Sequence, residues 1–395
     1  MMDYSKIVCR RIADVPPSGI RKFFDIVSEM KDAISLGVGE PDFTTPWRYN
    51  DAAIYSLRQG HTHYTSNWGL IELRRAIADY QKTRFGVSYN PVNEILVTVG
   101  ASEGIDLALR AIIEPGDEVI APDPTYVSYV PGIVFAGGVC VTLPTYAKDN
   151  FKMTPEALKA AITPKTKALI LPYPNNPTGG VMDKSDMKKI AEVLKGTDII
   201  VIADEIYAEL NYGDKKHTSF ASLSGMWERT ITLNGFSKAF AMTGWRMGYA
   251  CGPKELMEVM VKIHQYTMLC APVMGQYAAL EALEAGKENK YEDVAHMVRT
   301  YDRRRRIVVD SFNKMGLTCF EPLGAFYAFP SIKSTGMTSQ EFCKKLLGSK
   351  KVAAVPGDAF GSLGEGHIRV SYATATDKVI EAMKRIAEFV EELKE

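Results

Sequence analysis

The chain has 395 residues, of which 46% are hydrophobic and 24% are charged, the composition of an ordinary globular protein. Its 47 basic residues balance 47 acidic ones, so charge gives no reason to expect a nucleic acid or an anionic membrane as a partner. The start of the chain is polar and no run reaches about 18 apolar residues, so we expect neither a secretion signal nor a membrane span.

The first 45 residues are expected to form an arm with short elements. Within this arm, residues 37–43 read Gly-Val-Gly-Glu-Pro-Asp-Phe, and their glycines let backbone N–H groups approach a ligand closely. A plain loop with proline breakers is the alternative interpretation of this segment. A polar aromatic loop follows at residues 61–69, before a helix predicted at residues 70–85.

From residue 95 onward, short β-branched runs alternate with helical patterns. Helices are predicted at residues 105–113, 154–161 and 184–194, and strands at residues 95–99, 118–121, 139–143, 168–171, 199–203, 230–233 and 247–251. This alternation is typical of an α/β fold with a mainly parallel, helix-covered sheet. We therefore predict a large cofactor-binding domain at residues 46–285.

The rest of the chain lacks this strict rhythm. Residues 286–316 are predicted as one long helix whose four arginines, residues 303–306, lie on a partly solvated face with ion pairs rather than in a nucleic-acid patch. Strands at residues 325–329, 352–355 and 367–372 mix with helices at residues 339–347 and from residue 377. This order predicts a smaller α+β domain, formed by residues 286–395 together with the arm at residues 1–45.

Polar clusters follow four of the predicted strands. They are residues 100–102 (Gly-Ala-Ser), 175–179 (Asn-Asn-Pro-Thr-Gly), 204–207 (Asp-Glu-Ile-Tyr) and 237–238 (Ser-Lys). Ligands of open α/β sheets bind beyond the carboxyl ends of the strands. Four clusters at one such edge predict a single ligand site more strongly than any one cluster does.

The first cluster opens a helix, where free N–H groups and the positive end of the helix dipole suit a phosphate. A helix start capped by Ser102, with no ligand, is the alternative. The sequence contains neither Gly-x-x-x-x-Gly-Lys-Ser/Thr nor a Gly-x-Gly-x-x-Gly fingerprint at this place. These absences argue against a nucleoside triphosphate and against a dinucleotide.

Lys238 is the candidate for covalent chemistry, because a partly desolvated lysine near other cations forms Schiff bases readily. Arg246, eight residues further on, is a cation that could grip phosphate oxygens. Asp204 could pair with a protonated pyridine nitrogen, or it could only be the N-cap of a helix beginning at Glu205. Asn176 and Tyr207 could bind a phenolic oxygen, although turn chemistry and packing are the simpler readings of these two residues.

Other catalytic patterns are weak in this sequence. The six histidines are scattered, and neither His-Glu-x-x-His nor Gly-x-Ser-x-Gly occurs. The six cysteines form no Cys-x-x-Cys pair, which argues against zinc and iron–sulfur sites. A chain that can bury a full core needs no disulfides, so a reducing cytoplasm is the expected location.

With these residues in order, the sequence resembles the class I and II aminotransferases, which are pyridoxal-phosphate enzymes of fold type I. The resemblance extends from residue 18 to the end of the chain. The motifs that carry it, in the family's order, are residues 36–43, 64–65, 176–179, 204–207, 237–238, 243–246 and 369–371.

The resemblance implies pyridoxal 5'-phosphate as cofactor and a ping-pong transfer of an amino group from an L-amino acid to a 2-oxo acid, 2-oxoglutarate being the expected acceptor. Lys238 would hold the cofactor as a Schiff base and then move protons as acid and base. Asp204 would pair with the pyridine nitrogen, and Asn176 and Tyr207 would bind the phenolic oxygen. The other implied cofactor contacts are Ala101, Ser102, Ser237 and Arg246 at the phosphate, Tyr126 stacked on the ring, and Tyr64 reaching over from the second subunit of a homodimer.

For the substrate, the resemblance implies that Arg369 clamps the α-carboxylate with help from Gly39 and Asn176, and that Phe326 lines the pocket. Some aspartate-using relatives carry a lysine where this chain has Glu103. A glutamate that faces the pocket would repel an acidic side chain. Aromatic, neutral and distally amino-bearing donors therefore stay open beside aspartate-like ones, and Glu103→Lys is expected to favour aspartate.

Three alternative functions accompany this reading. A β-lyase that eliminates sulfur from cysteine conjugates would need the same Lys238 and Asp204. Residues 171–174 and 330–334 resemble a bacterial branch linked to acetyl-diaminopimelate. A cofactor-binding transcription regulator is disfavoured by the neutral charge and by a fold that begins too near the start of the sequence for a preceding helix-turn-helix.

Overall fold

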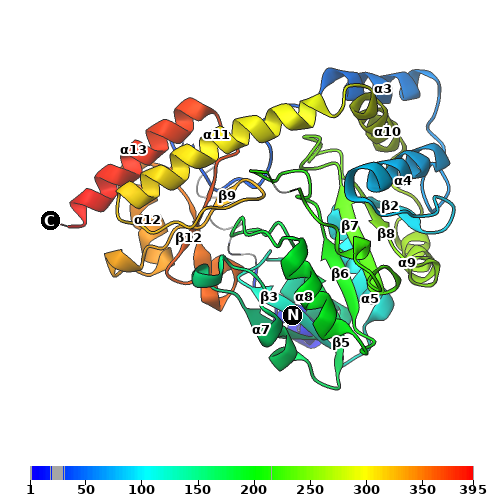
Figure 1. Ribbon diagram of the computed structural model, residues 1–395, viewed down its shortest axis with the longest axis horizontal. Helices are drawn as coiled ribbons and strands as arrows, with labels where there is room; N and C mark the ends of the chain where they lie inside the picture. The colour runs from blue at the N-terminus through cyan, green and yellow to red at the C-terminus, as the bar shows by residue number, and fades with distance from the viewer. Residues whose placement is uncertain (1, 18, 20–29, 31, 215, 395) are drawn as a thin grey trace.

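The structure is a computed structural model that describes residues 2–17, 19, 30, 32–214 and 216–394 (Figure 1). The part of the predicted arm and of the family resemblance that falls on residues 18, 20–29 and 31 lies outside the described residues. A short helix, α1 (Arg10–Ala13), belongs to the described part of the arm.

A seven-stranded sheet forms the centre of the chain, with strand order β2-β8-β7-β6-β5-β3-β4. Its strand β8 runs antiparallel to both of its neighbours, whereas the pairs from β7 to β4 are parallel. The predicted α/β fold with a mainly parallel sheet is therefore confirmed. The strands are β2 (Ile95–Val99), β3 (Glu118–Asp123), β4 (Val139–Pro144), β5 (Thr166–Leu171), β6 (Ile200–Asp204), β7 (Thr230–Gly235) and β8 (Met247–Cys251).

The two faces of this sheet are apolar because successive side chains of a strand point to opposite faces. In β6, Val201 and Ala203 pack into one cluster of buried residues and Ile202 packs into another. Helices cover both faces, as an apolar parallel sheet requires. On the Ile202 side lie α5 (Gly100–Ile112), α6 (Tyr129–Ala136) and α9 (Lys254–Thr267); on the other lie α7 (Pro155–Ala161) and α8 (Lys184–Leu194). Packed at the β2 end are α3 (Trp47–Arg58), α4 (Ile71–Phe85) and α10 (Val273–Glu288).

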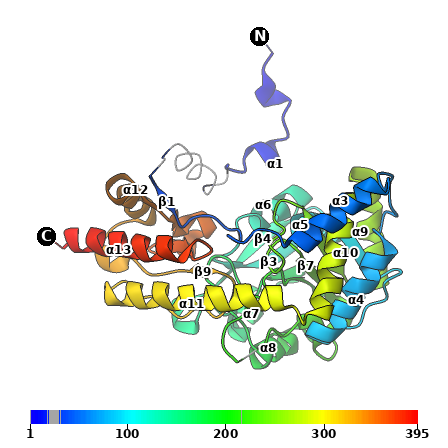
Figure 2. The same cartoon turned by 90° about the horizontal axis from the view of Figure 1, so that it is seen from above.

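The C-terminal part of the chain builds a second region around its own apolar core. Its long helices α11 (Glu292–Lys314) and α13 (Thr376–Glu392) run side by side, as Figures 1 and 2 show. A three-stranded antiparallel sheet and a parallel pair complete it, together with α12 (Ser339–Lys350). The strands are β9 (Tyr327–Ala328), β11 (Val355–Pro356) and β12 (Ile368–Ser371) in the sheet, and β1 (Ile34–Ser35) and β10 (Val352–Ala353) in the pair.

Several predicted elements need correction. The single helix predicted at residues 286–316 is wrong: α10 ends at Glu288 and α11 begins at Glu292. Lys290 and Tyr291 take left-handed backbone conformations there, and the Tyr291 ring lies where a side chain on Gly286 would be. The strand predicted at residues 352–355 divides between two sheets. Helices α3, α6 and α9 and most of α10 were missed, and α5 begins five residues earlier than predicted.

The arginine run on α11 follows the predicted pattern of ion pairs. Arg303 and Arg306 are exposed, whereas Arg304 and Arg305 are buried. Arg304 pairs with Asp42 at 2.9 Å and so ties residues 37–43 to the second region. The predicted domain boundary after residue 285 falls inside α10, and the domain division itself stays a prediction.

Candidate active site

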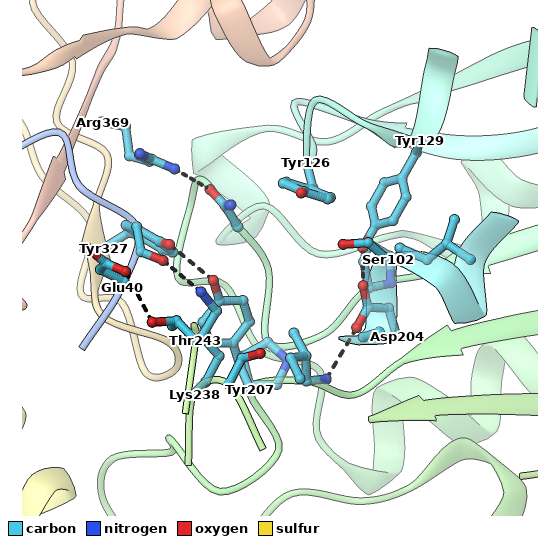
Figure 3. Close-up of a pocket in the computed structure, with 18 of the residues that line it drawn as sticks. Glu40, Ser102, Tyr126, Tyr129, Asp204, Tyr207, Lys238, Thr243, Tyr327 and Arg369 are labelled. Carbon is cyan, nitrogen blue, oxygen red and sulfur yellow. Dashed lines mark hydrogen bonds between the residues drawn. The ribbon is translucent and has the colours of Figure 1, made fainter. Parts of the chain in front are cut away.

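The predicted strand-end clusters meet at one edge of the large sheet. Strands β5, β6 and β7 run parallel, and β2 has the same direction because both it and β7 are antiparallel to β8. Their carboxyl ends border a cavity of about 360 Å³ (Figure 3). The predicted site residues that line it are Gly39, Ala101, Ser102, Tyr126, Asn176, Asp204, Tyr207, Ser237, Lys238, Arg246 and Arg369.

Lys238 lies in the turn after β7, and its Nζ donates a hydrogen bond to the Gly39 carbonyl oxygen at 2.6 Å. Burial, with the positive charge of Arg369 as a second cause, lowers the pKa of Lys238 to about 8. The Nζ also lies 5.8 Å from the centre of the Tyr207 ring. A lysine of this kind has a substantial neutral fraction near neutral pH, as an amine that attacks a carbonyl group needs.

Asp204 ends β6 at the far side of the cavity from Arg369 (Figure 3). Its carboxylate accepts a hydrogen bond from the Tyr129 hydroxyl at 2.6 Å and another from the Ile206 N–H at 3.1 Å. Burial raises the pKa of Asp204, and the hydrogen bond from Tyr129 opposes this rise. A buried carboxylate held in this way can pair with a cationic nitrogen.

The residues predicted to bind the phosphate gather where β2 passes into α5. Gly100 has a φ of +74°, and a side chain there would collide with the Arg246 guanidinium. Ala101, Ser102 and Ser237 line the same part of the cavity. The first turn of a helix, two serine side chains and an arginine suit a phosphate group.

Arg369 on β12 is a buried cation, only 2% exposed. It donates hydrogen bonds to the Asn176 side-chain oxygen at 2.9 Å and to the Gly37 carbonyl oxygen at 2.5 Å, while its Nε has no partner among the described residues. Its guanidinium lies 4.5 Å from the Tyr327 ring centre and 4.8 Å from that of Phe360. No carboxylate of the described residues pairs with it, so the site can accept an external one.

The amide group of Asn176 and the hydroxyl group of Tyr207 complete the middle of the cavity. Because the Asn176 oxygen accepts from Arg369, its amide nitrogen remains as a donor toward the cavity. The Tyr207 hydroxyl lies 2.9 Å from the Tyr327 hydroxyl. Both groups can hydrogen-bond a ligand oxygen placed between Lys238 and Asn176.

Three predicted residues do not line the cavity. Glu103 is a correction: its carboxylate accepts hydrogen bonds from the His264 ring at 2.7 Å and from the Val99 N–H at 2.5 Å. Successive helix residues differ by about 100° around the axis, so when Ser102 faces the cavity Glu103 turns away. Phe326 is fully buried and does not line the cavity, and its ring centre lies 5.8 Å from the Lys238 Nζ. Tyr64 is 81% exposed and lines a different surface pocket.

The cavity also contains residues that the sequence motifs do not indicate. Tyr129 forms a hydrogen bond with Asp204, and Tyr327 forms one with Tyr207. Glu40 accepts a hydrogen bond from Thr243 at 3.0 Å. Tyr129 stands three residues after the predicted Tyr126, but no motif singled it out. Tyr327 follows Phe326 directly, and the alternation along a strand makes only one of two neighbours face the cavity. Among the described residues, no cluster of His, Cys, Asp or Glu could hold a metal ion.

The fold and the site fit an enzyme that binds a phosphorylated carbonyl compound at a lysine. Beside this compound, Arg369 can bind the carboxylate group of a second ligand. The family model for aminotransferase class I and II matches residues 31–386. The aspartate aminotransferase of Pyrococcus abyssi is 49% identical over 97% of this chain and 98% of its own length. For aromatic-amino-acid aminotransferase 2 of Thermococcus litoralis the identity is 44%, over the same shares of the two chains. The crystal structure of an aromatic aminotransferase from Pyrococcus horikoshii superposes with a TM-score of 0.90 at 46% identity, covering 94% of this chain and 99% of that one.

The chain belongs to the class I and II aminotransferase family. It is a transaminase that depends on pyridoxal 5'-phosphate. The donor set in the cavity fits this cofactor: a lysine with a lowered pKa for its carbonyl carbon, a buried carboxylate for its ring nitrogen, and the β2–α5 junction for its phosphate. In the described part of the chain, no helix has the length and apolar character needed to cross a membrane.

Proposed function

We propose that this aminotransferase takes the amino group from L-amino acids with aromatic or neutral side chains and passes it to 2-oxoglutarate. The cavity supports this preference. Its cationic lining residues are Lys238, Arg246 and Arg369, each with a proposed role at the cofactor or at the α-carboxylate. The remaining lining offers aromatic and aliphatic surface, which suits the side chain of an aromatic or neutral donor.

The observation that carries the proposal is the state of Arg369. A buried guanidinium without a carboxylate partner is costly unless a ligand supplies the missing charge. Its free Nε and the stacked rings of Tyr327 and Phe360 hold it ready for a planar carboxylate. Amino acids and 2-oxo acids share such a group, so one clamp serves both halves of the reaction.

The residues that line the cavity have separate roles in the proposed reaction. Pyridoxal phosphate, when bound, supplies an electron sink that makes the substrate Cα proton removable. Lys238 accepts and returns that proton at its Nζ, for which its lowered pKa suits it. Arg369 and Asn176 orient the carboxylate, Asp204 holds a positive charge on the ring nitrogen, and Tyr207 donates to the phenolic oxygen.

We further propose that the protein is a cytoplasmic homodimer in which Tyr64 binds the phosphate in the partner's cavity. The exposure of this tyrosine, at 81%, supports a contact beyond its own chain. It lies in a loop that Gln276 ties to α10 through a hydrogen bond to Thr65 at 3.2 Å. The cytoplasmic location is supported by the cysteine usage of the sequence.

A donor screen of the holoenzyme with 2-oxoglutarate tests the substrate proposal. Phenylalanine, leucine, aspartate and N-acetyl-LL-diaminopimelate are compared by kcat/KM, with glutamate formation as the readout. We expect phenylalanine to exceed aspartate by about tenfold or more, which corresponds to about 1.4 kcal/mol of transition-state binding.

Other outcomes of the screen assign a different function. A preference for aspartate contradicts the proposed side-chain selectivity. Preference for the acetylated donor assigns the acetyl-diaminopimelate branch instead. If cysteine conjugates release pyruvate and ammonia and no donor yields glutamate, the reaction is β-elimination and not the transfer of an amino group.

A further inference from the structure

Tyr327 links the two halves of the cavity, whereas the predicted site contained its neighbour Phe326 in its place. It belongs to β9, is only 1% exposed, and lines the cavity between Tyr207 and Arg369 (Figure 3). Its hydroxyl lies 2.9 Å from the Tyr207 hydroxyl, and its ring lies under the Arg369 guanidinium at 4.5 Å.

We propose that Tyr327 is a positioning residue that sets the direction of the Tyr207 hydrogen bond. Its O–H donates to the Tyr207 oxygen, so the Tyr207 proton is directed at the phenolic oxygen of the cofactor. The inference rests on the proposed role of Tyr207 as the donor to that oxygen.

The direction follows from counting protons. Each hydroxyl carries one proton, so only one of the two tyrosines can donate within the pair. A phenolate oxygen is a stronger acceptor than a neutral hydroxyl, because charge-assisted hydrogen bonds are about twice as strong. Tyr207 therefore donates to the cofactor. Among the described residues, Tyr207 is the hydrogen-bond partner of the Tyr327 hydroxyl, so the Tyr327 proton goes to the Tyr207 oxygen.

Such a chain of donors strengthens each of its bonds by mutual polarisation, by about 10–30% per bond. Burial makes this effect large, since Tyr207 is only 6% exposed. A stronger bond to the phenolic oxygen stabilises its anionic form. Tyr327 thereby helps to lower the pH at which the lysine-bound cofactor loses its proton.

Gly39 keeps the Tyr327 hydroxyl in place by having no side chain. A methyl group on Gly39 would lie 2.8 Å from the Tyr327 hydroxyl oxygen, but 3.8 Å from the ring carbon that bears it. Gly39→Ala should therefore displace the hydroxyl, while a phenylalanine at position 327 would leave room for the methyl group.

The test is the pH titration of the visible absorbance of the bound cofactor in the holoenzyme, without substrate. We expect Tyr327→Phe to raise the midpoint in the same direction as Tyr207→Phe, by about 10–30% of that shift. Gly39→Ala should raise it similarly in the parent chain and add no further shift in the Tyr327→Phe chain. Tyr327→Leu should also raise KM for the amino acid, because it removes the ring under Arg369.

Tyr89→Phe is the matched control, since Tyr89 forms a buried hydroxyl pair with Thr232 at 3.0 Å away from the cavity. Its titration should equal that of the parent chain. An unchanged or lowered midpoint in Tyr327→Phe, beside a raised one in Tyr207→Phe, overturns the role of Tyr327 alone. An unchanged midpoint in Tyr207→Phe overturns both assignments, whereas transaminase activity and the donor screen stand independently.

Discussion

At the scale of single residues, the site works by placing charges where water is scarce. Lys238 lies near two arginines, and Arg369 has no carboxylate partner among the described residues. Burial disfavours the charged form of the lysine, while the arginine keeps its charge and is proposed to bind an anion. The transfer of an amino group from an amino acid to a 2-oxo acid requires a base for the proton and a cation for the carboxylate. This cavity contains both.

The lowered pKa of Lys238 predicts the pH dependence of cofactor uptake. Only the neutral amine attacks a carbonyl group. With a pKa of about 8, Lys238 is mainly neutral at pH values above 8. The rate of pyridoxal phosphate incorporation into the apoenzyme should rise about tenfold per pH unit below that value and level off above it. Stopped-flow absorbance measures this rate. A rate that keeps rising toward pH 10 would show an ordinary lysine, and Lys238→Ala should give no lysine-bound product.

Glu103 provides a second prediction at this scale. Glu103→Lys would place an ammonium group beside the fully buried His264 and remove two hydrogen bonds. We expect the free energy of unfolding to fall by about 3 kcal/mol or more. The ratio of aspartate to phenylalanine activity should not change, because the side chain does not line the cavity.

Denaturant unfolding measures the loss of stability, and Glu103→Gln is the matched variant. Its amide oxygen can still accept from the Val99 N–H, so it should cost less than the lysine variant. A raised aspartate ratio in Glu103→Lys would instead restore the first expectation, that this residue faces the substrate.

At the scale of elements, the β2–α5 junction is the proposed site of the cofactor phosphate. The left-handed turn at Gly100 brings the helix start under Arg246, and Gly248 on β8 lets the two backbones approach. The Thr98 hydroxyl donates to the Gly100 carbonyl oxygen at 2.9 Å and fixes the turn. The proposed phosphate site thus depends on one turn between two elements.

Gly100→Ala should weaken cofactor binding. The added methyl group would collide with the Arg246 guanidinium, and a left-handed backbone costs a non-glycine residue about 1–2 kcal/mol. We expect the Kd for pyridoxal phosphate, measured in the Lys238→Ala background by equilibrium dialysis, to rise at least about tenfold. Gly116→Ala is the control, since Gly116 has a similar φ of +93° and open space around it. Equal affinities in the two variants would contradict the proposed phosphate grip.

At the scale of the whole molecule, the cavity joins the large sheet to the C-terminal region. Lys238 and Asp204 come from the sheet, whereas Arg369 and Tyr327 come from β12 and β9. Residues 37–43 pass between them, held by the Arg304–Asp42 pair. If Lys238 and Asp204 bind the cofactor and Arg369 binds the substrate, as proposed, the two molecules are held by different regions and the reaction depends on the alignment of these regions.

The proposed dimer predicts complementation between two damaged subunits. Lys238→Ala removes the covalent anchor, and Tyr64→Phe removes the hydroxyl proposed to reach the partner's phosphate. In a mixed dimer, one cavity should carry both defects and the other neither. Mixing refolded subunits should therefore restore parental cofactor affinity and activity in part. Activity no higher than the sum of the separate variants would show that Tyr64 does not act in the partner's cavity.

Much of this site could be predicted from the order of the residues. Parallel strands share one edge for their carboxyl ends, so a polar cluster after each strand is enough to place Asp204, Asn176 and Lys238 together. The same reasoning gave the strands of the large sheet, because runs such as residues 199–203 are apolar on both faces. Helix α6 escaped it because its residues are apolar on all sides, so no periodic pattern marks it. Helices α3 and α9 do carry an amphipathic pattern, which was not recognised.

By itself, the sequence determined the type of fold and the edge of the sheet at which Lys238 lies, because these depend on local patterns and on the common direction of the strands. The cofactor followed from the resemblance of its motifs to one family. The tertiary structure alone decided which neighbour of a pair faces the cavity: Ser102 rather than Glu103, and Tyr327 rather than Phe326. It also supplied Tyr129 as the partner of Asp204. These choices depend on how a helix is rotated and a strand is seated against distant elements, and contacts between residues far apart in the chain set both.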